Sequence, residues 1–157
     1  MKIVLDPCCG ERVWTRKSRA RVVGCDLVNA NADVRCSMTR LPFHPNTFDA
    51  VRCDPPHLIR NDVKNWNPSY LRYGHWKSRA QWTDALLAVG REFHRVTRPG
   101  ATLLMKIIDG KDHRVTKYAD LSLLAQWWNE AHIVRKPSPV PWSTNTTLWV
   151  WFRRRAA

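Results

Sequence analysis

The sequence predicts an α/β fold built on a doubly wound, mostly parallel sheet of seven strands. Short apolar runs alternate with polar turns through the first half of the chain, a pattern typical of parallel strands that are covered on both faces. Three of these runs end at or just before an aspartate, namely Asp6, Asp26 and Asp54. A helix with one apolar stripe follows the last of them, as expected for an α/β sheet.

The first four strands are expected in the first third of the chain. Residues 2–5 open it with Lys-Ile-Val-Leu, and 21–25 follow with Arg-Val-Val-Gly-Cys. A short third strand is expected over 33–36. The fourth is expected over 48–53, where Phe-Asp-Ala-Val-Arg-Cys precedes Asp54.

The second half begins with a helix over 82–96, because its apolar residues recur every three or four positions and form one stripe. Arg98-Pro99-Gly100 ends this helix. The apolar pattern then predicts a strand over 101–108, a helix over 117–129, and strands over 132–135 and 147–152.

Composition limits the classes of protein to consider. A chain of 157 residues fits a single domain, here 1–157, and no apolar run approaches the roughly 20 residues of a membrane span. No leader peptide is recognised, so a cytoplasmic protein is expected. The five cysteines are odd in number and lack zinc-ligand spacing, which favours reduced thiols and no metal site.

The net charge is the unusual part of the composition. Lys and Arg total 26 against 13 acidic residues, which gives a formal charge of +13. Such a charge attracts polyanions and favours a nucleic-acid partner, although it can also serve solubility alone.

The three strand-end aspartates suggest a site. In open α/β sheets ligands bind outside the carboxyl ends of the strands, so Asp6, Asp26 and Asp54 are expected to face one crevice. Any one aspartate by itself is better explained as a turn or cap residue, whereas the three together favour a site.

Several short motifs together resemble a known family. The chain carries LDPCCGER at 5–12, Asp26, RLPF at 40–43, DPPH at 54–57 and FHRVTRPG at 93–100. In this order and spacing they resemble class I S-adenosylmethionine-dependent methyltransferases, and most of all the very small ones encoded by bacteriophages. The resemblance implies a Rossmann-like methyltransferase fold with abbreviated helices.

The resemblance also implies where the cofactor S-adenosyl-L-methionine binds, leaving S-adenosyl-L-homocysteine as product. The first turn is expected to cradle the methionine part, Asp26 the ribose, and the segment after the third strand the adenine. Met38 in that segment is equally compatible with a role in the core. The expected cofactor residues are Asp6, Pro7, Cys8, Cys9, Gly10, Asp26, Leu27, Ser37, Met38 and Asp54.

The Asp54-Pro55-Pro56-His57 turn is the expected catalytic element, since this slot reads [DNS]-P-P-[YFWH] in enzymes that methylate exocyclic or amide nitrogens. Asp54 and the Pro55 carbonyl would accept the two N–H groups of a planar amine, while Pro56 helps fix the turn. His57 would stack on the flat target. The alternative is that the two prolines only end a strand.

Residues 58–80 are expected to form a substrate loop, because basic residues alternate with aromatic ones there, as in surfaces that bind phosphates and stacked bases. The alternative is a loop that packs its aromatic rings on the sheet edge. The expected substrate residues are Arg60, Lys64, Trp66, Tyr70, Tyr73 and Trp76. A second basic cluster, either a phosphate track or a solvated helix face, comprises Arg12, Arg16, Lys17, Arg19 and Arg21.

Three functions remain open at this point. The first is methylation of an exocyclic amino group of a nucleic-acid base, with adenine N6 favoured over cytosine N4 and DNA over RNA. Such an enzyme would read sequence through its loops, form a homodimer, or accept loosely defined single strands. The second is methylation of a protein amide or small amine. The third is a non-catalytic cofactor-binding scaffold or anti-defence protein.

Overall fold

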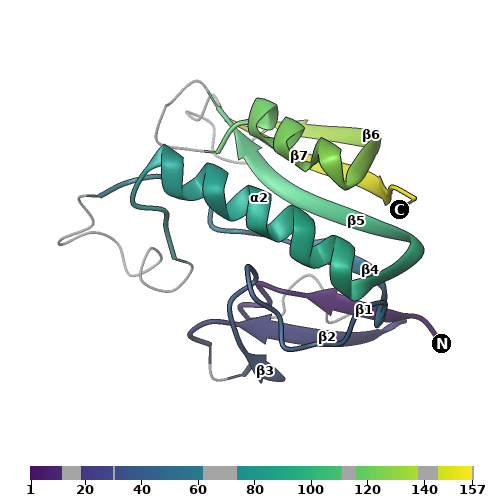
Figure 1. Ribbon diagram of the computed structural model, residues 1–157. Coiled ribbons are helices and arrows are strands. Elements are labelled where there is room, and N and C mark those ends of the chain that lie inside the picture. The colour runs from purple at the N-terminus through teal and green to yellow at the C-terminus, as the bar shows by residue number, and fades with distance from the viewer. Residues whose placement is uncertain (12–18, 30, 62–73, 111–115, 138–144, 157) are drawn as a thin grey trace.

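The computed structural model describes residues 1–11, 19–29, 31–61, 74–110, 116–137 and 145–156. They form a seven-stranded sheet in the order β3-β2-β1-β4-β5-β7-β6 (Figure 1). The strands are β1 Ile3–Asp6, β2 Arg21–Asp26, β3 Val34–Arg35, β4 Phe48–Cys53, β5 Thr97–Asp109, β6 Trp128–Pro137 and β7 Thr146–Arg154. The helices are α2 Arg79–Val96 and the 3-10 helix η1 Tyr118–Gln126.

The sheet is mixed, with its parallel part at the N-terminal end of the chain. β1 pairs in parallel with both β2 and β4, β2 with β3, and β4 with β5. β7 runs antiparallel between β5 and β6. The expected seven-stranded, mostly parallel sheet is therefore confirmed, and the carboxyl ends of β1, β2 and β4 lie at one edge.

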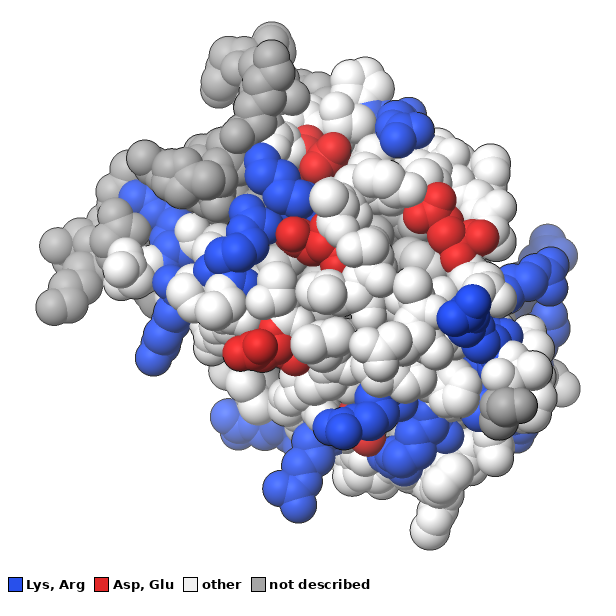
Figure 2. All heavy atoms as spheres, turned by 45° about the horizontal axis from the view of Figure 1, so that its top comes forward, with Lys and Arg blue, Asp and Glu red and all other residues white. Residues whose placement is uncertain are grey.

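Both described helices pack on the same face of this sheet (Figure 1). The doubly wound pattern had predicted helices on both faces, and no helix covers the second face among the described residues. Residues 12–18, between β1 and β2, lie outside them. On the side that carries the helices, acidic side chains are interspersed with basic ones (Figure 2).

Helix α2 begins three residues before its expected start. Ser78 caps it by accepting a hydrogen bond from the backbone N–H of Gln81 at 3.1 Å. The expected apolar stripe is buried in the core. Trp82 and Phe93, which belong to this stripe, are 1% and 0% exposed.

The largest difference from the expected elements lies at 117–129. The helix ends at Gln126 as a 3-10 helix, and Trp128 already belongs to a strand that is longer than the expected 132–135. Trp128 is 1% exposed, and its Nε1 donates a hydrogen bond to the carbonyl of Gly90 in α2 at 3.0 Å. This contact with a distant part of the chain outweighs the local helical pattern. The strand expected over 101–108 likewise extends to Thr97–Asp109.

Asp120 joins the two helices. Its Oδ2 accepts hydrogen bonds from Arg79 Nη1 at 2.6 Å, Trp82 Nε1 at 2.8 Å and the backbone N–H of Lys117 at 2.9 Å. One carboxylate oxygen thus fixes the start of η1 against the start of α2.

None of the helices in the described part of the chain has the length and apolar character needed to cross a membrane.

Asp120→Ala is expected to destabilise the fold by about 1–3 kcal/mol, because the buried Trp82 Nε1 loses its acceptor. Urea unfolding followed by circular dichroism measures the change. The matched control is Asp84→Ala, which removes an exposed carboxylate from α2, the helix that carries Trp82, and is expected to change stability by less than about 0.5 kcal/mol. Equal effects of the two substitutions would contradict this role of Asp120.

Candidate active site

The turns that follow β1, β2 and β4 meet at the carboxyl edge of the sheet. The backbone N–H of Cys9 donates to the carbonyl of Cys25 at 2.9 Å, which joins the first turn to β2. The thiol of Cys8 lies 3.9 Å from the sulfur of Cys53, the last residue of β4. The structure therefore brings together the first turn, the end of β2 and the end of β4, as the strand-end aspartates had suggested.

The first turn has the backbone shape of a ligand cradle. Gly10 has a φ of +45°, a conformation that glycine adopts readily, and a Cβ placed there would meet no atom of the described residues within 4 Å. The Gly10 carbonyl accepts a hydrogen bond from Asn29 Nδ2 at 2.6 Å. The turn is thus fixed from the β2 side while the space beside Gly10 stays open.

Asp26 supplies much of this fixation. Its Oδ2 accepts the N–H of Gly10 at 3.1 Å, and its Oδ1 accepts those of Val28 and Asn29, both at 3.0 Å. A carboxylate offers about four acceptor sites, so roughly one is left for a ligand hydroxyl. Asp26 can therefore contact a ribose through about one hydrogen bond, fewer than the two ribose hydroxyls would allow.

The other expected cofactor residues differ in accessibility. Leu27, directly after Asp26, is 62% exposed. Ser37 Oγ lies 2.8 Å from Thr39 Oγ1, within its own turn. Met38 is 8% exposed and belongs to the core, where its sulfur accepts the Cys8 thiol at 3.3 Å. Of the two roles considered for Met38, the structure thus shows the core role.

The Asp54-Pro55-Pro56-His57 turn directly follows β4. Asp54 Oδ1 accepts a hydrogen bond from His57 Nε2 at 2.9 Å, and Oδ2 lies 2.6 Å from Lys106 Nζ. The Asp54 side chain is 25% exposed, and those of His57 and Lys106 are 14% and 29% exposed. Asp54, the expected catalytic aspartate, is thus held between a histidine and a lysine at a partly open edge.

The charge of Asp54 follows from these contacts. Burial by itself would raise the pKa of Asp54, but the hydrogen bonds from His57 and Lys106, with the positive charge of Lys106 and that of His57 when it is protonated, outweigh it and hold the pKa below its usual value. The carboxyl group is therefore ionised at neutral pH. Since its pKa is depressed on folding, the resulting stability is present above the unfolded-state pKa and is lost as the pH falls through the folded-state pKa.

Lys106 was not among the expected site residues. The signal available in the sequence is a single lysine in the otherwise apolar run Leu103-Leu104-Met105-Lys106-Ile107-Ile108. Only the pairing of Cys53 with Met105, which sets β4 beside β5, shows that the lysine lies next to Asp54.

The neighbourhood of His57 fixes the turn. Trp76 Nε1 donates to the Pro56 carbonyl at 2.8 Å, and the His57 carbonyl accepts the N–H of Thr116 at 2.9 Å. His57 Nδ1 is buried and has no hydrogen-bond partner among the described residues. A buried polar atom of this kind costs free energy unless a ligand or water contacts it, and it commonly marks a functional site.

The expected substrate loop is described only at its two ends. Trp76 packs against the core, with its ring 5.3 Å from that of Trp82. Since it also donates a hydrogen bond to Pro56, it supports the turn at 54–57. Arg60 takes part in the backbone bridge beside Trp76, to whose carbonyl its N–H donates at 2.7 Å. Of the second basic cluster, Arg19 and Arg21 are exposed. The remaining expected residues lie outside the described part of the chain: Lys64, Trp66, Tyr70, Tyr73, Arg12, Arg16 and Lys17.

The cysteines of the first turn are poor candidates for a nucleophile. A hydrogen bond with Cys53, together with burial, raises the pKa of Cys8 well above its usual value, so the thiol stays protonated. Asp54, His57 and Lys106 are therefore the candidate groups for chemistry at this site.

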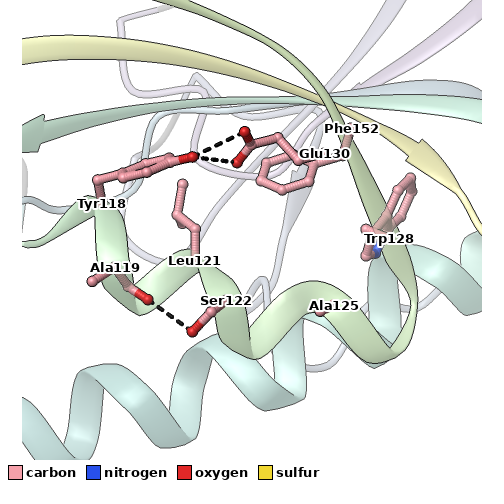
Figure 3. Close-up of a pocket in the computed structure, with 8 residues that line it drawn as sticks. All are labelled: Tyr118, Ala119, Leu121, Ser122, Ala125, Trp128, Glu130 and Phe152. Atoms are coloured by element: carbon pink, nitrogen blue, oxygen red, sulfur yellow. Dashed lines mark hydrogen bonds between the residues drawn. The ribbon is translucent and has the colours of Figure 1, made fainter.

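A separate pocket of about 160 Å³ lies between η1 and the β6–β7 edge (Figure 3). Its lining includes Leu121, Trp128 and Phe152, and at one end Tyr118 Oη donates to Glu130 (Figure 3). The volume is below the 300–1,000 Å³ that is usual for small-molecule sites. None of the expected site residues lines it.

A scan against protein-family models finds no match, and a search of curated protein sequences finds no significantly similar protein. Solved structures do match over nearly the whole chain. A SAM-dependent methyltransferase from Methanosarcina mazei aligns with a TM-score of 0.65 at 11% identity, over 99% of this chain and 93% of that one.

Two further structures show the range of chemistry on this fold. The 1,6-didemethyltoxoflavin-N1-methyltransferase of Burkholderia thailandensis, with bound S-adenosylhomocysteine, aligns with a TM-score of 0.61 at 15% identity, over 99% of this chain and 72% of that one. The [4+2]-cyclase SpnF aligns with a TM-score of 0.66 at 13% identity, over 99% of this chain and 76% of that one. The chain therefore has the fold of class I S-adenosylmethionine-dependent methyltransferases, and at these identities the likeness establishes the fold alone.

Lys106→Met is expected to raise the pKa of Asp54, because burial favours the neutral acid and the ammonium no longer opposes it. A pH titration of the side-chain carboxyl carbon by NMR measures this directly and needs no activity. Lys136→Met, which removes an exposed lysine from β6, is the control and should leave that titration unchanged. An unshifted Asp54 in Lys106→Met would show that the ion pair does not set its charge.

Proposed function

We propose that this protein is an S-adenosylmethionine-dependent methyltransferase that acts on an exocyclic amino group of a nucleic-acid base, with adenine N6 as the favoured acceptor and DNA favoured over RNA. The observation that carries the proposal is the ionised Asp54 in a Pro-Pro turn at the sheet edge, beside the open turn at Gly10. The resemblance of the motifs to small bacteriophage enzymes and the shared fold support the same activity.

The first turn fits the proposed cofactor. Gly10 leaves open space where a side chain would otherwise stand, Asp26 keeps an acceptor for one ribose hydroxyl, and Leu27 offers an exposed apolar surface beside it. When bound, the cofactor supplies an electrophilic methyl group on a sulfonium sulfur. The residues of the turn bind and orient it.

Asp54 is suited to align a planar amine. Its two oxygens each accept one hydrogen bond from His57 or Lys106, so about two acceptor sites stay available for an amine N–H. When Asp54 accepts an N–H of the amine, the lone pair of the nitrogen becomes more localised. The fixed turn would direct this lone pair toward the methyl group of the cofactor. Most of the rate enhancement would then come from alignment and electrostatics.

His57 offers a route for the proton that the methylated nitrogen must lose. With Nε2–H donating to Asp54, the neutral ring carries its lone pair on Nδ1, the atom that has no partner among the described residues. Nδ1 can accept the proton while Asp54 stabilises the resulting imidazolium.

The acceptor class rests on charge. A formal charge of +13 favours a polyanionic substrate over a small amine or a protein amide. One structural neighbour, the 1,6-didemethyltoxoflavin-N1-methyltransferase, binds a small molecule, which keeps a small-amine acceptor as the second candidate. A non-catalytic cofactor-binding scaffold or anti-defence protein is the third candidate, because a shared fold does not by itself establish methyl transfer.

Two alanine substitutions are expected to separate chemistry from cofactor binding. Asp54→Ala should lower the transfer rate by a factor on the order of 100 or more, with the Kd for the cofactor changed only a few-fold. Asp26→Ala should instead weaken cofactor binding by roughly 10- to 100-fold, since hydrogen bonds to a charged group contribute about 1.5–3 kcal/mol. Isothermal calorimetry and single-turnover kinetics provide the two readouts, and thermal melting checks folding. Full activity of Asp54→Ala would exclude the proposed catalytic turn.

The decisive assay follows tritium from labelled S-adenosylmethionine into unmethylated DNA, unmodified RNA and cell protein in parallel. Label in a nucleic acid, identified by nucleoside mass spectrometry, would name the base. Label only in protein would favour the second candidate. Confirmed cofactor binding with no label in any acceptor would favour a non-catalytic role.

A further inference from the structure

The two sides of the sheet differ where β5, β7 and β6 lie next to one another. On β5, Leu103, Met105 and Ile107 are at most 1% exposed and belong to the core beneath the helices. Leu104 and Lys106 lie between them and point to the opposite side, because side chains alternate along a strand. They are only half-buried. We call the side of Leu103, Met105 and Ile107 the helix face, and the side of Leu104 and Lys106 the open face.

Strand register extends the open face across β7 and β6. Trp151 pairs with Leu104 and therefore shares its face. A β-bulge between Glu130 and His132 then sets His132 opposite Trp151. In a regular strand, residues two apart share a face, so the bulge is what separates His132 from Glu130.

Basic residues collect on this open face. Arg153 and Lys136 are exposed, and their strand partners Thr102 and Thr147 place both on the open face. Neither makes a hydrogen bond or ion pair with a described residue. The basic residues of the open face are Arg52 of β4, Lys106, His132, Lys136 and Arg153.

The acidic residues of the same three strands lie on the helix face. They are Asp109, which accepts the backbone N–H of Tyr118, and Glu130, which accepts the Tyr118 hydroxyl. The side of the molecule that carries the helices therefore has mixed charge (Figure 2), whereas β5, β6 and β7 carry no carboxylate on the open face.

Aromatic rings accompany these charges. Trp151 is half-buried, and the His132 ring lies 5.5 Å from it at an interplanar angle of 46°. Lys106 Nζ lies 5.8 Å from the centre of the Trp149 ring. Basic side chains interleaved with aromatic rings bind phosphates and stack unpaired bases, which is the recurring chemistry of single-strand binding surfaces.

We propose that the open face of β5, β7 and β6 is a binding surface for single-stranded nucleic acid, with Arg153 and Lys136 contacting phosphates and Trp151 stacking on a base. The surface reaches the candidate active site through Lys106, which contacts Asp54. A second copy of this chain is a poor occupant, because two open faces would bring like charges together. The proposal deepens the proposed function, on which it rests for the acceptor class.

The test measures binding of fluorescently labelled oligothymidine and oligouridine by anisotropy, without cofactor, over a range of NaCl concentrations. The double variant Lys136→Gln/Arg153→Gln is expected to lose affinity and to make the slope of log K against log salt shallower by about 1.4, since each phosphate contact on a single strand contributes about 0.7. The matched control is Arg40→Gln/Arg91→Gln, which removes the same charge from two exposed arginines near α2. It should leave the slope nearly unchanged.

Trp151 supplies the second readout. Trp151→Ala is expected to weaken binding by roughly 5- to 100-fold, and Trp151→Phe, which keeps an aromatic ring, by only a few-fold. Thermal melting confirms that each variant is folded. Binding of either DNA or RNA that depends on these residues supports the proposal. The nucleic acid that binds more tightly is then identified as the preferred ligand.

Equal losses in the open-face and control variants would indicate attraction by net charge alone and overturn the proposal. Binding restricted to duplexes would overturn it as well. These outcomes are separate from those of the transfer assay. Methyl transfer to a nucleic acid that is insensitive to the open-face variants would overturn this inference and leave the proposed function intact. Open-face binding without any methyl transfer would support this inference and contradict the proposed function.

Discussion

Parallel pairing of β1 with both β2 and β4 is the constraint on which the rest of the site depends. It places three carboxyl ends at one edge, so that segments up to 45 residues apart, such as Cys8 and Cys53, come into contact. Backbone groups at these ends are no longer paired within the sheet and must find other partners. Asp26 meets this need by accepting three N–H groups, and the turn around Gly10 takes its shape from that carboxylate.

The same edge holds the partly buried carboxylate of Asp54, and the free-energy cost of burying its charge has to be offset. Asp54 gains this compensation from Lys106 on the neighbouring strand and from His57 three residues along its own turn. Lys106 lies in a strand paired with β4, so the strand register sets its contribution to this compensation, while the turn sets that of His57. The Pro-Pro turn and the hydrogen bond from Trp76 to Pro56 then limit how far His57 can move.

The short chain gives the molecule two unlike surfaces. Among the described residues, α2 and η1 cover one face of the sheet, and the acids of β5 and β6 bind Tyr118 on that side. The opposite face keeps the basic residues and a half-buried tryptophan.

The sequence by itself determined the strands and the place of the site. Continuous apolar runs bounded by turn residues predict β4 at its observed bounds, and β1 and β2 to within one residue, because such runs need burial on a sheet. The aspartates at the ends of these strands predict that the candidate site lies at the carboxyl edge of the sheet. Only the tertiary structure decided the limits of η1 and β6, the partnership of Lys106 with Asp54 and the side on which His132 lies. Each of these depends on a contact between distant segments: Trp128 with Gly90, β4 with β5, and a bulge whose position only strand pairing reveals.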